Sequence, residues 1–305
     1  MVTASPRRKQ VSLGLVGTSA VWDADYRAAI RMLARYVTVR GVYDTVPARA
    51  DQTAREWQAV VAPSLMSLYE RTEIDAVILL ENAWHGWFAL NLACRFHKPT
   101  LITGPFRGTL ADLDHWNLSA RDAGVLLMAA CPRRHTPATN RLRELMATRL
   151  GAPRAIHVDL CVPADAARDE LINIIDWCSC VVGRAPTAAA VSQVTDADRD
   201  VVLSFSTSDI TAQIQVRRSA DATMTERLQV DGQHGSAWLT GPNDIGWKIG
   251  DEERQENLTS DRPSVNIIVD QFCRRVVGGL VPVPHLGDLL RSIRHAESAG
   301  YIWPA

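Results

Sequence analysis

Short apolar runs alternate with amphipathic segments over the first 130 or so residues. Each apolar run has the length of a buried strand, and the segments between them repeat apolar residues every three or four positions, as helices do. Strands that alternate with helices pair in parallel, because each helix carries the chain back along the sheet. The pattern therefore predicts an α/β fold that opens with a doubly wound parallel sheet, with helices on both faces. Its predicted strands are Val11–Gly17, Val37–Tyr43, Ile74–Leu80, Thr100–Thr103 and Val125–Met128.

The second half of the chain has a different pattern. A predicted helix over Pro137–Thr148 and an apolar helix over Leu171–Val182 flank an alternating segment, Arg154–Val162. Period-two segments then favour a largely antiparallel or mixed sheet, and they cover Val201–Ser206, Thr211–Arg217, Glu226–Val230 and Ser236–Leu239. Helical blocks follow at Ser264–Val277 and Leu286–Ala299. We therefore predict a domain boundary near residues 130–135, with one domain over residues 1–132 and a second α/β domain over residues 133–305.

The composition narrows the classes of function. With 33 basic and 34 acidic residues among 305, the formal net charge is −1, which gives no electrostatic footprint for nucleic acid or an anionic membrane. No apolar run approaches the roughly 20 residues of a membrane span. We therefore expect a cytoplasmic protein without membrane or nucleic-acid partners, and we interpret the polar residues 1–10 as a tail rather than an export signal.

The cysteines and histidines predict neither disulfides nor a metal site. The six cysteines include no CxxC pair, which is typical of reduced thiols in a cytoplasmic protein. The eight histidines show no His-x-His or HExxH spacing, so we expect no bound metal.

A glycine turn follows the first predicted strand, and an acidic residue, Asp44, ends the second. This is the arrangement of a dinucleotide-binding domain, with the glycine in the phosphate turn and the acid on the ribose. The turn itself reads Gly17-Thr18-Ser19-Ala20-Val21-Trp22, in which Gly17 alone matches the GxGxxG pattern. Ser19 adds bulk where the backbone approaches the pyrophosphate, and Trp22 requires the turn to be re-routed.

Later landmarks follow in a characteristic order and spacing. They are Asn82-Ala83-Trp84-His85, Lys98-Pro99 with Thr103-Gly104-Pro105, Arg134-His135-Thr136-Pro137, Gly151–Val158, and Asn173-Ile174-Ile175-Asp176 with Gly183 beyond. Together they resemble the glucose–fructose oxidoreductase / inositol dehydrogenase (Gfo/Idh/MocA) family, from about Val11 to Ala299. The resemblance implies a Rossmann domain and a C-terminal α/β domain whose large open sheet often serves oligomerisation. It also implies NAD(P)-dependent oxidation or reduction at a hydroxyl carbon of a sugar, polyol or related compound.

The resemblance assigns the cofactor to positions Gly17, Ser19, Asp44, Asn82 and His85. Asp44 favours NAD over NADP, although a turn aspartate before Pro47 is equally consistent with the sequence. His85 either lines the cofactor cleft or packs against a neighbouring tryptophan. Because the glycine pattern is incomplete, we expect NAD or NADP to bind weakly.

The catalytic positions of the family carry different residues in this chain. The family's Glu-Lys-Pro reads Thr103-Gly104-Pro105, so Gly104 replaces the lysine. The family's Asp-x-x-x-His-x-x-Asp begins at Asp169 and ends at Asp176, with Asn173 in place of the proton-transfer histidine. Asparagine does not titrate near neutral pH. The resemblance assigns Arg134, His135 and Asp169 to the substrate.

Two functions follow from these replacements. The first is an oxidoreductase-fold protein that has lost its chemistry and serves ligand sensing or assembly; three independent losses favour it. The alternative is an NAD(P)-dependent oxidoreductase with a rearranged site for a sugar or polyol. In either case we expect a small-molecule ligand and a homo-oligomer, with the outer face of the sheet over Val201–Leu239 forming a dimer interface.

Overall fold

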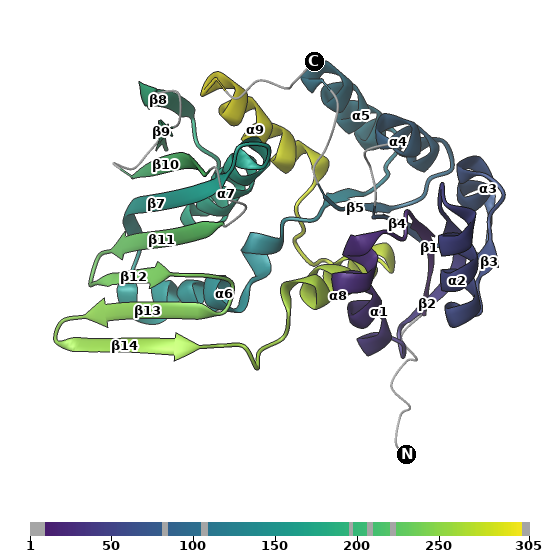
Figure 1. The fold of residues 1–305 in the computed structure, drawn as a ribbon, viewed down its shortest axis with the longest axis horizontal. Coiled ribbons are helices and arrows are strands. Elements are labelled where there is room, and N and C mark those ends of the chain that lie inside the picture. Colours follow the sequence, from purple (N-terminus) through teal and green to yellow (C-terminus); the bar gives the residue numbers. More distant parts are fainter. Residues whose placement is uncertain are drawn as a thin grey trace. The chain divides into compact units, whose positions relative to one another are not determined.

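The computed structural model describes residues 10–80, 85–104, 109–194, 198–205, 210–219 and 224–300. These residues form two compact units. Unit one contains the described residues up to Ala130 together with Val265–Gly287, and unit two contains Cys131–Ser264 with those from Asp288 onward. Each unit is built around one β-sheet (Figure 1).

Unit one is built on a parallel sheet with the strand order β3-β2-β1-β4-β5-β6. Its central strands are apolar because helices cover both faces; all four residues of β4 are buried. The chain starts at β1, moves outward through β2 and β3, and then returns to β4 on the other side of β1. The strands are β1 (Val11–Val16), β2 (Val37–Tyr43), β3 (Val60–Val61), β4 (Ala76–Leu79), β5 (Thr100–Ile102) and β6 (Leu127–Ala129).

The chain returns to unit one late in the sequence, where it forms helix α8. Helix α8 places Ile268, Val269 and Phe272 in the same buried cluster as β1, β2 and α1, and Figure 1 shows α8 beside α1. The predicted division at residues 132 and 133 stays a prediction, and it did not include this return. The helices are the π-helical η1 (Trp22–Tyr26), α1 (Arg27–Met32), α2 (Pro47–Trp57), α3 (Leu65–Glu70), α4 (Gly86–Arg95), α5 (Leu110–Asp122) and α8 (Ser264–Val276).

Unit two contains an eight-stranded sheet in the order β14-β13-β12-β11-β7-β10-β9-β8. The pairing of β7 with β10 is parallel, and the other pairings are antiparallel. The strands are β7 (Pro153–Pro163), β8 (Ala188–Val194), β9 (Asp198–Ser204), β10 (Thr211–Ser219), β11 (Thr225–Gly232), β12 (Ser236–Leu239), β13 (Asp244–Ile249) and β14 (Glu252–Asn257).

Helices cover one face of this sheet. Helix α7 contacts β7 and β10, while α6 contacts β12 and β13 (Figure 1). On β10, residues alternate strictly between buried and exposed, so Thr211, Gln213, Gln215 and Arg217 lie on the opposite, open face. The helical elements are the 3₁₀ turn η2 (Pro132–His135), α6 (Pro137–Leu145), the π-helical η3 (Met146–Leu150), α7 (Ala167–Val182) and α9 (Leu286–Ser298).

These two sheets confirm the predicted fold class, a Rossmann-type parallel sheet followed by a large, mostly antiparallel one. All six cysteines are free thiols. Within the described ranges, no helix is long and apolar enough to cross a membrane.

Candidate functional site

The strand order of unit one places its crevice at the carboxyl end of β1. The sheet reverses its winding between β1 and β4, and ligands of open α/β sheets bind at this switch point. Gly17 follows β1 with φ at +76°, a conformation that side chains disfavour, and its N–H donates to the carbonyl of Tyr43 at 2.9 Å. The predicted tight turn after the first strand is therefore present.

Asp44, at the end of β2, is turned inward and holds this turn in place. Its Oδ2 accepts hydrogen bonds from the N–H of Thr18 at 2.6 Å and from the Thr18 hydroxyl at 2.9 Å. Its Oδ1 accepts from the N–H of Val46 at 2.8 Å. Only 7% of Asp44 is exposed. Because a carboxylate offers about four acceptor positions, one remains for a ribose hydroxyl.

Trp22 does not fill the phosphate turn. Its ring is buried in the core and meets Trp57 edge-on, with ring centroids 5.8 Å apart. The first helix opens into a π-helical segment at this point, Trp22–Tyr26, which is the local re-routing that the tryptophan requires. Asp23 is exposed and pairs with Arg27 at 3.4 Å, so it does not cap the helix. Ser19 is half-buried, and its carbonyl accepts from the N–H of Trp22.

Of the remaining two cofactor positions, the structure describes His85, which lies beside the end of β2. His85 precedes α4, and its ring centroid lies 5.5 Å from that of Tyr43, the last residue of β2. This contact brings the histidine to the carboxyl end of the sheet, where the resemblance expects it. Asn82 lies outside the described residues, as does Trp84.

Gly104 occupies the position of the family's lysine and faces open space. It is exposed with φ at +73°, and a Cβ added there would meet no atom of the described residues within 4 Å. Lys98 cannot take over, because it precedes β5 whereas Gly104 follows it. The Lys98 ammonium donates to the carbonyls of Arg71 at 2.9 Å and Ile74 at 2.6 Å, and burial lowers its pKa.

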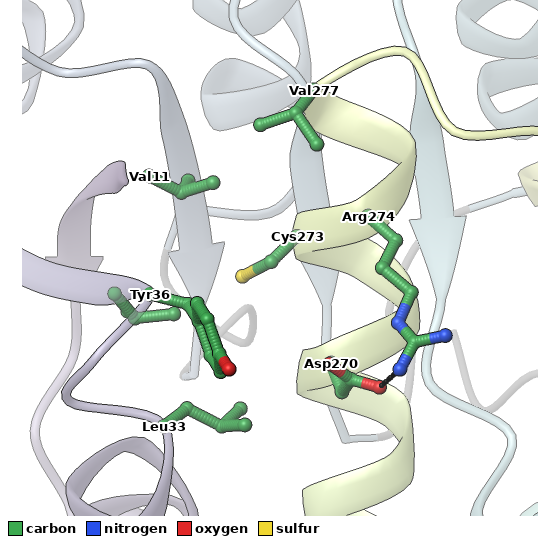
Figure 2. Close-up of a pocket in the computed structure, with 8 residues that line it drawn as sticks. Val11, Leu33, Tyr36, Asp270, Cys273, Arg274 and Val277 are labelled. Atoms are coloured by element: carbon green, nitrogen blue, oxygen red, sulfur yellow. Dashed lines mark ion pairs between the residues drawn. The ribbon is translucent and has the colours of Figure 1, made fainter. Parts of the chain in front are cut away.

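Unit one also contains a small hollow between α1, the start of β2 and α8. Figure 2 shows it with Leu33 and Tyr36 on one side, Cys273 on the other, and an ion pair between Asp270 and Arg274 at its edge. Its volume of about 20 Å³ accommodates a single water molecule. We therefore do not regard it as a ligand site.

Unit two holds a much larger pocket, of about 640 Å³, within the range of small-molecule sites. Asn173 of α7 lines it, and its amide has no hydrogen-bond partner among the residues that the structure describes. Its walls combine hydroxyl groups with apolar side chains, among them Thr136, Thr225, Thr240, Trp177 and Leu228. The pocket therefore offers neutral donors and acceptors on an apolar surface.

A series of hydrogen bonds makes one wall of the pocket rigid. The Trp177 indole N–H donates to the Thr139 hydroxyl at 3.0 Å, and the hydroxyls of Thr139 and Thr136 lie 2.9 Å apart. Thr136 caps the first turn of α6 by accepting from the N–H of Thr139. A capped helix start and a fixed indole make this wall rigid.

The charged part of the pocket is a cluster of three side chains. Arg133 donates to Glu170 on α7 at 2.6 Å and to Glu226 on β11. All three line the pocket and are largely buried. Burial lowers the pKa of Arg133, but Glu226 and Glu170 outweigh that effect and raise it above its ordinary value. The guanidinium therefore remains charged and fixes both carboxylates.

Two predicted site residues, Arg134 and Asp176, pair with each other. The Arg134 Nε donates to Asp176 Oδ2 at 2.7 Å, and a second bond joins Nη2 and Oδ1. Only 3% of the Asp176 side chain is exposed. Neither residue lines the 640 Å³ pocket. A role in substrate binding or catalysis stays a prediction for these two, and it would require this ion pair to open.

The other two predicted substrate residues lie near the cluster but outside the pocket lining. His135 is buried; burial and the charges of Arg134 and Arg143 lower its pKa to about 4, so it is neutral at physiological pH. Asp169 is half-buried and pairs with Arg168 at 3.3 Å. Sequence reasoning missed Arg133 and Glu226. Glu226 lies 53 residues from Asn173 (226 − 173), and only the pairing of β11 with β7 brings it to the pocket.

No metal centre is formed by the described part of the chain, where no group of three or more His, Cys, Asp and Glu could hold an ion.

Comparison with known proteins bears on the fold. No protein-family model matches the chain, and no curated protein matches its sequence. Solved structures do match it. UDP-N-acetylglucosamine 3-dehydrogenase GnnA from Acidithiobacillus ferrooxidans is 18% identical, with a TM-score of 0.79 over 96% of this chain and 98% of that one. A putative myo-inositol dehydrogenase from Sinorhizobium meliloti is 19% identical, with a TM-score of 0.76 over 95% and 98%.

A 3-ketoreductase from Actinomadura kijaniata, solved in complex with NADP and TDP-benzene, is 16% identical, with a TM-score of 0.75 over 95% of this chain and 97% of that one. Identities at this level carry the fold, and both the Rossmann unit and the open-sheet unit are included in the match. The resemblance found in the sequence is thereby confirmed: the chain has the fold of the Gfo/Idh/MocA-type dehydrogenases.

Proposed function

We propose that this protein is an NAD(P)-linked oxidoreductase that acts on a hydroxyl or carbonyl carbon of a sugar or polyol. The observation that carries the proposal is the pocket of unit two. The Asn173 amide, which has no partner among the described residues, and several hydroxyl groups stand on apolar walls, a surface suited to a polyhydroxylated molecule. The named activities of the structural neighbours favour this alternative over a protein without chemistry.

The turn after β1 is well suited to the phosphates of a dinucleotide. The end of β2 is less well suited to its ribose. Gly17 and Ser19 would hold the phosphate end, since Gly17 keeps the required backbone turn and Trp22 is packed away from it. Asp44 would offer a single acceptor, because the chain itself occupies the rest of its carboxylate. When bound, the nicotinamide would accept or give the hydride. We therefore expect weak binding, in the high micromolar range.

The proton that leaves or joins the substrate hydroxyl needs an acceptor in the pocket. Asn173 does not titrate near neutral pH, and Arg133 stays charged. Glu170 and Glu226 are the other ionisable groups in the described lining. Glu170 lies one turn before Asn173 on α7, so its Oε1 is the atom that we assign to proton transfer.

A second candidate, ligand sensing without catalysis, is supported by one specific observation. Gly104 leaves open space where the family's lysine would contact the substrate, and Lys98 is committed to backbone carbonyls elsewhere. A protein of this kind would bind its ligand in the same pocket and transfer no hydride.

Calorimetric titration with NADH tests the cofactor part of the proposal. We expect binding in the high micromolar range and a loss of at least tenfold in Gly17→Ala, because φ at +76° strains any side chain. Gly124→Ala is the matched control, since Gly124 also has a positive φ of +64° but follows α5, outside the turn. Equal affinities for the wild type and Gly17→Ala, or no binding at all, would argue for the second candidate.

A further inference from the structure

The Arg133 cluster leaves the pocket of unit two with an uncompensated charge. Among the described lining residues, Arg133 contributes one positive charge, while Glu170 and Glu226 contribute two negative ones, for a formal balance of −1 (1 − 2). The side chains are 15%, 21% and 14% exposed, respectively, so solvent does not fully screen them.

Each carboxylate also keeps an oxygen for a ligand. Arg133 uses Oε2 of Glu170 and Oε2 of Glu226. The Oε1 atoms make no hydrogen bond with any residue that the structure describes. One guanidinium holds both carboxylates, so neither can move away from Arg133 without losing its ion pair. A carboxylate oxygen held in a region of net negative charge accepts a hydrogen bond from an ammonium group, which donates up to three.

The other lining residues determine which groups the rest of the ligand can carry. Hydroxyl groups of Thr136, Thr225 and Thr240 and the amide of Asn173 suit neutral hydroxyls. The cation of the described lining, Arg133, is already paired with two glutamates, so a carboxylate or phosphate of a ligand would meet a net negative charge.

We infer that the pocket selects a polyhydroxylated ligand that carries a protonated amine, and that it rejects anionic sugars, including those linked to a nucleotide diphosphate. The inference rests on the proposed function for the sugar or polyol class, and it adds the charge of the substrate. Glu170 and Glu226 are the specificity-determining residues. The ammonium takes Oε1 of Glu226, which leaves Oε1 of Glu170, the atom assigned to proton transfer, for the proton of the reacting hydroxyl.

Calorimetric titration of the full chain with matched pairs tests this inference. D-Glucosamine is compared with D-glucose, and D-glucamine with D-sorbitol, so that an amine replaces one hydroxyl in each pair. D-Glucuronate serves as the anionic probe. The buffer is at low salt and pH 6, below the pKa of about 7.7–8.0 typical of α-amino groups, so that the amines are protonated.

We expect the amine to bind at least tenfold more tightly than its neutral counterpart in at least one pair, with no detectable binding of D-glucuronate. Glu170→Gln and Glu226→Gln should each reduce this ratio below threefold. Glu253→Gln is the matched control and should leave the ratio unchanged, because Glu253 on β14 pairs with Lys248 on β13, outside the pocket. Thermal unfolding of each variant checks that it is folded, and the two separate substitutions guard against one failing to fold.

A ratio below tenfold in both pairs, or a ratio that survives both pocket substitutions, overturns the inference. The same results also distinguish a failure of this inference from a failure of the proposed function. Binding of D-glucose or D-sorbitol without any gain from the amine ends the inference and leaves the function standing. Amine-selective binding without hydride transfer leaves the inference standing and ends the function. If none of the four neutral and amine probes binds, both are wrong.

Discussion

The ion pair between Arg134 and Asp176 tests whether these residues stabilise unit two or bind the ligand. We predict that Asp176→Asn destabilises unit two without changing ligand binding in the pocket. The two head groups are joined by two hydrogen bonds, and Asp176 is almost wholly buried, with 3% of its side chain exposed. The substitution keeps the shape of the side chain but leaves the Arg134 guanidinium without its counter-charge.

The magnitude follows from the burial of both partners. Removing one member of a buried pair costs about 3–5 kcal/mol, because the other charge stays desolvated and unpaired. Arg134 retains 19% side-chain exposure, so partial hydration places the expected loss near the lower end, at about 3 kcal/mol. The neutral amide can still accept one of the two hydrogen bonds, which also limits the loss.

Urea unfolding followed by circular dichroism measures the effect. With a slope of about 1–3 kcal/mol per molar urea, a loss of about 3 kcal/mol moves the midpoint by about 1–3 M. Arg134→Met combined with Asp176→Asn should cost clearly less than the sum of the single changes. A loss below about 1 kcal/mol would refute the structural role. So would a tenfold change in sugar affinity, which would return Asp176 to the binding site.

Three further predictions concern other parts of unit two. Folding lowers the pKa of His135 from 6.5 to about 4, so the neutral histidine contributes fully to the free energy of unfolding above pH 6.5. That free energy should fall by up to about 3 kcal/mol as the pH drops toward 4, and urea unfolding of the wild type and His135→Asn at pH 7.5 and 5 measures the difference. Gly246→Ala should cost about 1–3 kcal/mol, since the added Cβ would overlap the Trp238 ring, and a thermal midpoint equal to that of the wild type would contradict it. The open sheet face around Gln213 and Gln215 should form a homodimer interface of at least about 1,200 Å²; a monomeric mass by light scattering at micromolar concentration excludes it.

Hydrophobic periodicity predicted most of the fold, and the misses have physical causes. Strand β4 of unit one is buried on both faces, so it is a continuous apolar run, Ala76–Leu79. Strand β14 was missed because Glu252–Asn257 contains only polar residues. It is the edge strand of its sheet, and its side chains remain largely exposed, so no apolar pattern marks it. Strand β3 was missed because it is two exposed residues long, Val60–Val61.

The candidate site was less accessible from the sequence. The positions of Gly17, Gly104 and Asn173 follow from the order of landmarks along the chain, and the structure places the first at a tight turn and the last in a pocket. Whether Asp44 faces a ligand or its own turn depends on the Thr18 hydroxyl, which no spacing rule predicts. The contact of Arg133 with Glu226 joins residues 93 positions apart and depends on the sheet register.

The most direct test of the account is hydride transfer itself. Purified protein is mixed with saturating NAD⁺ and each of the matched sugars and amino sugars, and the formation of NADH is followed by its absorbance. We predict slow NADH formation that requires the pocket ligand, is half-maximal at a high-micromolar concentration of NAD⁺, and is lost in Gly17→Ala but retained in Gly124→Ala. No NADH from any ligand that calorimetry shows to be bound, with NAD⁺ at saturation, would contradict the proposed oxidoreductase activity.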